Sequence, residues 1–345
     1  MLASPISFAQ AGSGDDETLR RILRETPLPG WVSLSFEREP SYFAADRAKG
    51  GRHVTVVARA GEEIVGFFSR SCAPAYINGQ KQDLGYLREL RFVQGYQGKL
   101  RAMREGYAYW RDHMQSGTYD LTAILEDNKP ARKLLEAGLD GLPTYQPAGG
   151  FSTLALKARR WGAGDKAIVQ GEEGRLEEIV AFLNRVYQYH QFAPVLKAKD
   201  ICSRGLKPED FLLFEEAGIV RGCLAIWDQR AFKQAVVRRY APALRVLRPL
   251  LRLPKVGSAL SQASLSFLAV EDKRSLRTLV VAALVECARR GIDFASLGLA
   301  TNNPLLGQAK ADFRHREYKS RLYLVHWEDE VILDDPIIHV DLGEL

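Results

Sequence analysis

The chain has 345 residues, of which 46% are hydrophobic and 26% charged, and this is the composition of a folded globular protein. Its length exceeds the usual size of one hydrophobic core, so we expect two domains. Apolar runs fall short of the roughly 18 residues that span a bilayer, and residues 1–13 lack a basic segment followed by an apolar one. We therefore expect no transmembrane segment and no secretory signal.

The four cysteines bear on metal binding and on the cellular compartment. Cys72, Cys202, Cys223 and Cys287 show neither CxxC spacing nor a neighbouring histidine, so we expect no metal site. Unpaired cysteines with apolar neighbours are typical of a reducing compartment, which predicts a cytoplasmic protein.

The net charge of +6 is concentrated in one segment, residues 229–256. That segment holds eight basic residues and no acidic one: Arg230, Lys233, Arg238, Arg239, Arg245, Arg248, Arg252 and Lys255. The rest of the chain is close to neutral, so we expect no specific nucleic-acid binding. A charged flap packed by its leucines is the favoured interpretation, ahead of an acidic partner and of a membrane surface.

The first half of the chain alternates helix and strand patterns. A helix begins at Asp15 or Asp16 and carries Leu19, Ile22 and Leu23 on one face. Alternating strands at 54–60 and 64–69 flank the Gly61 turn and predict a hairpin. A strand at 87–93, a helix at 100–114, a strand at 119–125, a short helix ending at Ala137 and a closing strand at 151–156 follow.

The second half repeats this order. Leu176, Ile179, Val180 and Leu183 repeat the apolar helix face, strands at 211–215 and 223–227 flank Gly218, and a strand at 265–270 precedes a helix at 276–290 and a strand at 294–299. The pairs Leu100-Arg101 and Leu276-Arg277 open the two long helices. The repeat predicts tandem domains at 1–160 and 161–345, joined near 157–166, with the basic segment as an insertion in the second.

The loop at 96–102 carries a more specific signal. After the strand that ends at Phe92-Val93, it reads Tyr-Gln-Gly-Lys-Leu-Arg-Ala and leads into the long helix. This resembles the pyrophosphate loop of the Gcn5-related N-acetyltransferase superfamily, and the element order of both halves resembles that family's domain. The resemblance implies an α/β (α+β) fold, with two tandem domains that each contain a mixed twisted sheet flanked by helices.

The resemblance also implies where acyl-CoA binds. Amides at a helix N-terminus carry partial positive charge and lack partners within the helix, so they bind a diphosphate. The implied cofactor-binding residues are Phe92, Val93, Gln97, Gly98, Lys99, Leu100, Arg101, Ala102, Asn128 and Arg132. Asn128 is also a suitable helix N-cap, and we favour capping over a contact with the pantetheine arm, although both roles are compatible.

Several positions depart from the family pattern. Leu100 replaces the middle glycine of the loop, and residues 273–278 of the second half contain no glycine. The tyrosine that often serves the family as an acid falls on Leu135 and Lys310. Because an acceptor amine must lose a proton, we consider Glu89 and Glu126 as candidate bases. We expect Tyr145 to be a core aromatic and His190 to pack in an aromatic cluster.

These observations predict an acyl-CoA-dependent N-acyltransferase. The expected reaction transfers acetyl from acetyl-CoA to a small-molecule or peptide amine, with the cofactor in the first half. The alternatives are a degenerate, non-catalytic acyl-CoA-binding module, and an aminoacyl-tRNA-dependent transferase that only the basic segment supports. A monomer and a homodimer both remain open.

Overall fold

A computed structural model of the protein describes residues 5–28, 30–47, 51–96, 98–113, 119–160, 165–247, 253–327, 331–334 and 337–345. The first half contains β1 (Ile6–Gln10), α1 (Asp16–Glu25), β2 (Val32–Glu37), α2 (Ala44–Arg47), β3 (Arg52–Ala60), β4 (Glu63–Ile77), β5 (Gln80–Phe92), α3 (Lys99–His113), β6 (Asp120–Leu125), α4 (Lys129–Leu135) and β7 (Thr144–Lys157).

The second half repeats that order, except that it lacks a counterpart of β2 and adds β11 and α7. It contains β8 (Ile168–Gln170), α5 (Leu176–Tyr187), α6 (Ala198–Ser203), β9 (Phe211–Glu216), β10 (Ile219–Trp227), β11 (Gln234–Tyr240), α7 (Pro242–Leu247), β12 (Gln262–Val270), α8 (Lys273–Arg289), β13 (Phe294–Ala300), α9 (Leu305–Asp312) and β14 (His315–His326). The predicted repeat is confirmed. Strands β2 and β11 were not predicted, and the strands predicted at 64–69 and 87–93 are parts of the longer strands β4 and β5, which form a hairpin.

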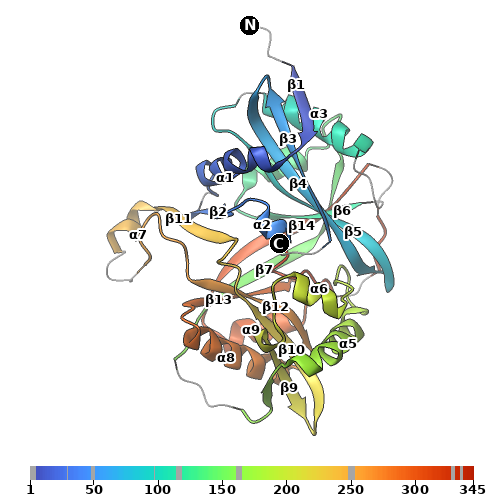
Figure 1. Ribbon diagram of the computed structural model, residues 1–345, viewed down its shortest axis with the longest axis vertical. Coiled ribbons are helices and arrows are strands. Elements are labelled where there is room, and N and C mark those ends of the chain that lie inside the picture. Colours follow the sequence, from blue (N-terminus) through green and yellow to red (C-terminus); the bar gives the residue numbers. More distant parts are fainter. Residues whose placement is uncertain are drawn as a thin grey trace.

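A single 12-stranded sheet runs through both halves, in the order β1-β3-β4-β5-β6-β14-β7-β13-β12-β10-β9-β8 (Figure 1). The closing strands are exchanged: β14 of the second half pairs with β6, and β7 of the first half pairs with β13. The two strands also pair with each other from His315↔Leu156 to His326↔Thr144. Separating the halves would therefore expose several unpaired strand edges. The domain boundary near residue 160 stays a prediction.

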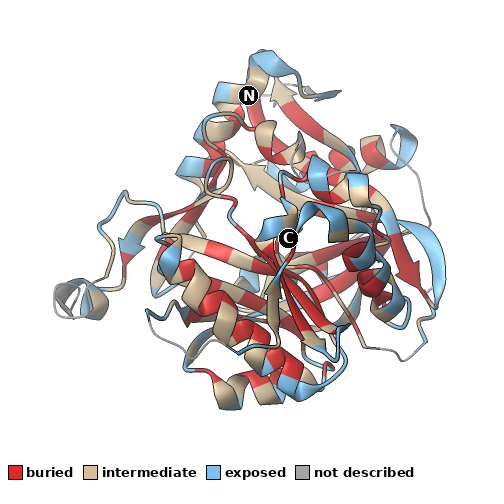
Figure 2. Ribbon diagram, turned by 60° about the horizontal axis from the view of Figure 1, so that its bottom comes forward, coloured by how far each residue is buried: buried red, intermediate tan, exposed pale blue. Residues whose placement is uncertain are grey.

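Helices cover both faces of the sheet, and alternate residues of each strand meet opposite helices. Leu224 and Ile226 of β10 pack in the cluster that contains α8, whereas Cys223 and Ala225 pack in the cluster that contains α5. The exchanged strand β7 contributes Leu154 and Leu156 to the α8 cluster. Figure 2 shows the strands buried between these helical layers. The exchange thus joins the halves through a shared core as well as through hydrogen bonds.

The basic segment forms an arm that projects from the sheet (Figure 1). Its strand β11 pairs antiparallel with β2, from Gln234↔Glu37 to Tyr240↔Val32. Arg238 donates to Ser35 Oγ at 2.8 Å and forms an ion pair with Glu37. Residues 248–252 lie outside the described residues. The segment therefore links the second half to the first, and its role as a flap or a partner site stays a prediction.

A buried ion pair lies where β5 and β6 come together. Arg70 Nε donates to Asp120 Oδ1 at 2.8 Å, and the two side chains are 7% and 1% exposed. Burial raises the pKa of Asp120 to about 6, and the charge of Arg70 opposes that rise. Gly85 faces Asp120 in the register, and a Cβ atom there would lie 1.3 Å from Asp120 Oδ1. Only glycine leaves room for this carboxylate.

We predict that Gly85→Ala lowers the free energy of unfolding by about 3 kcal/mol, because it displaces a buried ion pair. Chemical denaturation measures the change. Gly14→Ala is the matched control, since nothing lies within 4 Å of a Cβ atom at that position. Equal unfolding midpoints for the two variants would contradict this account of the β5–β6 junction.

Candidate functional site

Each half contains a β-bulge in the strand that precedes its long helix. Glu89 in β5 has φ 58° and Phe267 in β12 has φ 52°. The register shifts at both places, between Ser69↔Arg88 and Phe67↔Arg91 in the first half. In the second half it shifts between Ala225↔Ser266 and Cys223↔Ala269. A positive φ is rare for residues other than glycine, so the surrounding fold holds both residues in this conformation.

The strands diverge near each bulge. In the first half, β5 and β6 pair in parallel only at Gly85↔Asp120 and Tyr86↔Leu121. The rest of β5, which runs to Phe92, makes no ladder with β6. In the second half, β12 and β13 pair over four positions, from Gln262↔Phe294 to Leu265↔Leu297. The ladder between the central strands therefore ends three residues before the bulge in the first half and two residues before it in the second.

The two gaps differ in what covers them. Residues 88–92 of β5 are all partly exposed, whereas Phe267, Leu268 and Ala269 at the corresponding positions of β12 are buried. The segment 337–345 packs against the second bulge, where Asp341 Oδ2 accepts a hydrogen bond from the Phe267 amide at 2.5 Å. Asp341 also accepts from the Gly343 amide at 2.9 Å. The chain itself covers the second bulge, whereas the strand at the first bulge stays partly exposed.

The end of β5 leads directly to the start of α3. Phe92 stacks against Tyr96 with ring centroids 6.1 Å apart, and the Val93 amide donates to the Val65 carbonyl at 2.9 Å. Lys99 is the first residue of α3, and the Gly98 carbonyl accepts from the buried Ala102 amide at 2.9 Å. The free amides of this helix end therefore follow the open part of β5.

The side chains predicted at this helix start are solvent-accessible. Leu100 is 36% exposed, and Arg101 forms an exposed ion pair with Glu105 at 2.6 Å. Gln97 lies outside the described residues. The structure thus brings Phe92, Val93 and residues 98–102 together, while their contact with a cofactor stays a prediction.

The helix α4 holds the remaining predicted cofactor residues. Asn128 Oδ1 accepts from the Ala131 amide at 3.4 Å, which confirms the predicted N-cap. Arg132 donates to the Glu126 carbonyl at 3.2 Å and to Tyr323 Oη at 3.4 Å. It therefore ties α4 to the exchanged strand β14, a contact that the sequence did not indicate.

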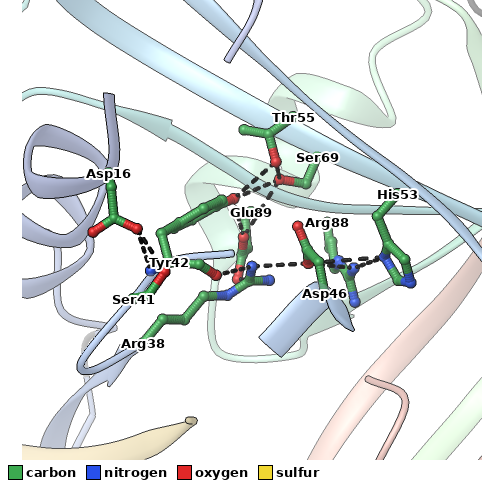
Figure 3. A network of polar contacts seen from close by, with 10 residues as sticks. All are labelled: Asp16, Arg38, Ser41, Tyr42, Asp46, His53, Thr55, Ser69, Arg88 and Glu89. Atoms are coloured by element: carbon green, nitrogen blue, oxygen red, sulfur yellow. Dashed lines mark hydrogen bonds and ion pairs between the residues drawn. The ribbon is translucent and has the colours of Figure 1, made fainter. Parts of the chain in front are cut away.

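A polar network surrounds Glu89 (Figure 3). Its carboxylate accepts from Arg38 at 2.7 Å and from Tyr42 Oη at 2.7 Å. Tyr42 Oη also lies 2.6 Å from Ser69 Oγ, and Arg38 contacts Asp46 at 3.0 Å. Burial and the Glu89 charge raise the pKa of Tyr42. Burial opposes the charge of Arg38, yet Glu89, Tyr42 and Asp46 raise its pKa.

Glu89 was predicted from the sequence as a candidate base, whereas Arg38 and Tyr42 were not predicted at this site. Both come from the segment between β2 and α2, which has no recognisable motif, and only the tertiary fold places them at the bulge.

The other candidate polar residues lie elsewhere. Glu126 is 42% exposed after β6 and lies 3.9 Å from Arg321. Tyr145 is buried in the core, as predicted, and its hydroxyl forms a hydrogen bond with that of Tyr107. His190 contacts the Val186 carbonyl at 3.0 Å and the His339 ring at 6.0 Å between centroids, which agrees with the predicted aromatic packing. Burial lowers the pKa of His190.

Solved structures with this fold cover almost the whole chain. N-myristoyltransferase of Saccharomyces cerevisiae with bound myristoyl-CoA matches with a TM-score of 0.64 and 11% identity, over 96% of this chain and 81% of that one. A further structure of the same yeast enzyme, with myristoyl-CoA and inhibitors, matches at 0.63 and 10% identity over 96% and 82%. The chain thus has the Gcn5-related N-acyltransferase fold in two copies.

A protein from Enterococcus faecalis V583 described as a probable N-acyltransferase has the same fold, with a TM-score of 0.51 and 9% identity over 92% of this chain and 72% of that one. No family model and no curated protein matches the chain. Among the described residues, no group of three or more His, Cys, Asp or Glu side chains is placed to hold a metal ion. No helix in the described part of the chain is long and apolar enough to cross a membrane.

We predict that Arg38→Met lowers the free energy of unfolding by about 3 kcal/mol, because it removes the buried cation that pairs with both the Glu89 and the Asp46 carboxylates. Arg21→Met is the control, since the 52% exposed Arg21 lies 3.6 Å from Glu25, and we expect a change within about 0.5 kcal/mol. Urea denaturation compares the two. An Arg38→Met variant as stable as the control would show that the network does not hold the bulge.

Proposed function

We propose that the protein is an acyl-CoA-dependent N-acyltransferase that binds acyl-CoA in the gap between β5 and β6. The observation that carries the proposal is the difference between the two bulges. Residues 88–92 are partly exposed, although the Arg88 side chain is only 6% exposed, whereas the matching strand of the second half is buried against residues 337–345. The yeast N-myristoyltransferase structures with bound myristoyl-CoA have the same two-copy fold and support this proposal.

The geometry accounts for each part of the cofactor. An extended pantetheine arm can hydrogen-bond to the unpaired edge of β5 as an added strand. The pyrophosphate then meets the amides at the start of α3, with Lys99 and Arg101 supplying positive charge. We include Gln97 among the pyrophosphate-binding residues because of its position in the sequence, directly before Gly98 and Lys99. The thioester reaches the bulge at Glu89, where the strands separate.

The proposed reaction forms a bond between the acceptor nitrogen and the acyl carbon and breaks the bond between that carbon and sulfur. The amine proton passes to a base, and CoA leaves as the thiolate. Holding thioester and amine side by side supplies most of the rate enhancement. Glu89 lies in the bulge and is better placed as the base than the surface residue Glu126.

The acyl group is proposed to be acetyl, and the acceptor a small-molecule or peptide amine. A non-catalytic acyl-CoA-binding module is the second candidate. Two observations favour it. The Glu89 carboxylate is already bound by Arg38 and Tyr42, and the apolar Leu135 stands at the position of the family's tyrosine acid. Release of CoA from acetyl-CoA in the presence of an amine panel supports an enzyme, whereas binding without release supports the module.

We predict that acetyl-CoA binds the full chain with a micromolar Kd, equivalent to about −8 kcal/mol, in isothermal titration. The double variant Lys99→Gln, Arg101→Gln should weaken binding about tenfold, or about 1.4 kcal/mol, because it removes charge next to the pyrophosphate. Myristoyl-CoA is titrated in parallel to compare acyl lengths.

The matched control is Arg274→Gln, Arg277→Gln at the start of α8, the corresponding helix of the second half. We expect its affinity to equal that of the unmodified protein. Weakening by the control variant alone would move the cofactor to the second half. Absence of binding to the unmodified protein would refute the proposed function.

A further inference from the structure

Positive side chains outnumber carboxylates beside the Glu89 bulge. Arg38 and Arg88 of the first half act on Lys233 of the second, and their charges together with burial lower the pKa of Lys233 to about 8. Arg91 is also buried near Glu89, whose charge acts on it. The carboxylates that compensate them are Asp46 and Glu89. Glu344 also acts on Lys233, but it already pairs with Arg204 at 2.7 Å. The cluster therefore has a surplus of positive charge.

The hydrogen bonds of the cluster are incomplete as well. The Arg88 side chain is only 6% exposed, and its Nη2 contacts Asp46 at 3.2 Å and His53 Nδ1 at 2.7 Å (Figure 3). Its Nε and Nη1 atoms are buried and find no hydrogen-bond partner among the described residues, and the same is true of Nε of Arg91. Burial lowers the pKa of Arg91, in spite of the Glu89 charge. Buried cations without partners are costly, and a bound anion offsets that cost.

The position of the cluster indicates which molecule supplies the anion. The pyrophosphate of acyl-CoA is proposed to lie at the start of α3, beyond Phe92. Arg88 lies on the other side of the Glu89 bulge, and Lys233 reaches it from the turn before β11. If the cofactor lies as proposed, this side of the bulge is the one left for the acceptor amine. The charge surplus therefore faces the acceptor and not the phosphates of the cofactor.

We propose that the acceptor amine belongs to a molecule that also carries an anionic group, a carboxylate or a phosphate, bound by Arg88 and Lys233. This inference rests on the proposed function, since it names the substrate class of the same site. Guanidinium and ammonium groups form charge-assisted hydrogen bonds with both anions. The surplus charge makes a neutral amine the poorer substrate.

The test compares anionic N-acetylated products with neutral isosteres, in the presence of CoA. N-acetylalanine is paired with N-acetylalaninamide, and N-acetyl-O-phosphoethanolamine with its neutral dimethyl phosphate ester. Isothermal titration and ligand-dependent thermal unfolding of the full chain give the Kd of each compound. At least one anion should bind about tenfold or more tightly than its neutral isostere, and the pair that shows the difference identifies the anion.

Lys233→Met and Arg88→Gln should each abolish the preference for the anionic compound. Because there are two variants, the test remains valid if one of them fails to fold. Arg277→Gln, on the far helix α8, should retain the preference. Equal affinity of both anions and their neutral isosteres, with CoA still bound, overturns this inference and leaves the proposed function intact. Loss of the preference in Arg277→Gln as well would also overturn it. Failure of CoA itself to bind overturns the proposed function.

Discussion

The exchange of the closing strands is the constraint on which the rest of the structure depends. Because β14 lies between β6 and β7, and β7 pairs with β13, neither half completes its own sheet. Leu154 and Leu156 of the first half fill the core of the second, and Tyr323 and Val325 of the second fill a core of the first. The halves are thereby fixed, so that the arm bearing Lys233 and the network around Glu89 can share one site.

The two halves contain the same bulge and use it differently. In the second half, Asp341 binds the amide of Phe267, and residues 337–345 seal the diverging strands. In the first half, Arg38 and Tyr42 hold the Glu89 side chain on one side, while the strand beyond it stays accessible. If acyl-CoA binds as proposed, the duplication supplies one partly exposed bulge for the cofactor and one covered copy that supports it. The chain need not have two active sites to have two copies of the fold.

The sequence predicted the order of the elements because each follows from local periodicity. Leu19, Ile22 and Leu23 lie buried on one helix face, as expected, and Asn128 caps its helix. The exchange of β7 and β14 was not predictable, since pairing partners distant in sequence leave no local pattern. For the same reason the sequence did not predict that Arg38 and Tyr42 bind Glu89, or that Asp341 binds the Phe267 amide. Local motifs indicated Glu89, the start of α3 and the first half as candidates, but not that residues 337–345 cover the bulge of the second half.

Hydrogen exchange of the full chain, with and without acyl-CoA, tests the central claim most directly. Amides of an unpaired strand edge exchange slowly once a ligand hydrogen-bonds to them. If the cofactor lies in the first half, acyl-CoA slows exchange at residues 88–92 and 98–102 and leaves residues 266–270 and 273–278 unchanged. Protection of the second set with no change in the first would contradict the account and place the cofactor in the half whose bulge residues 337–345 cover.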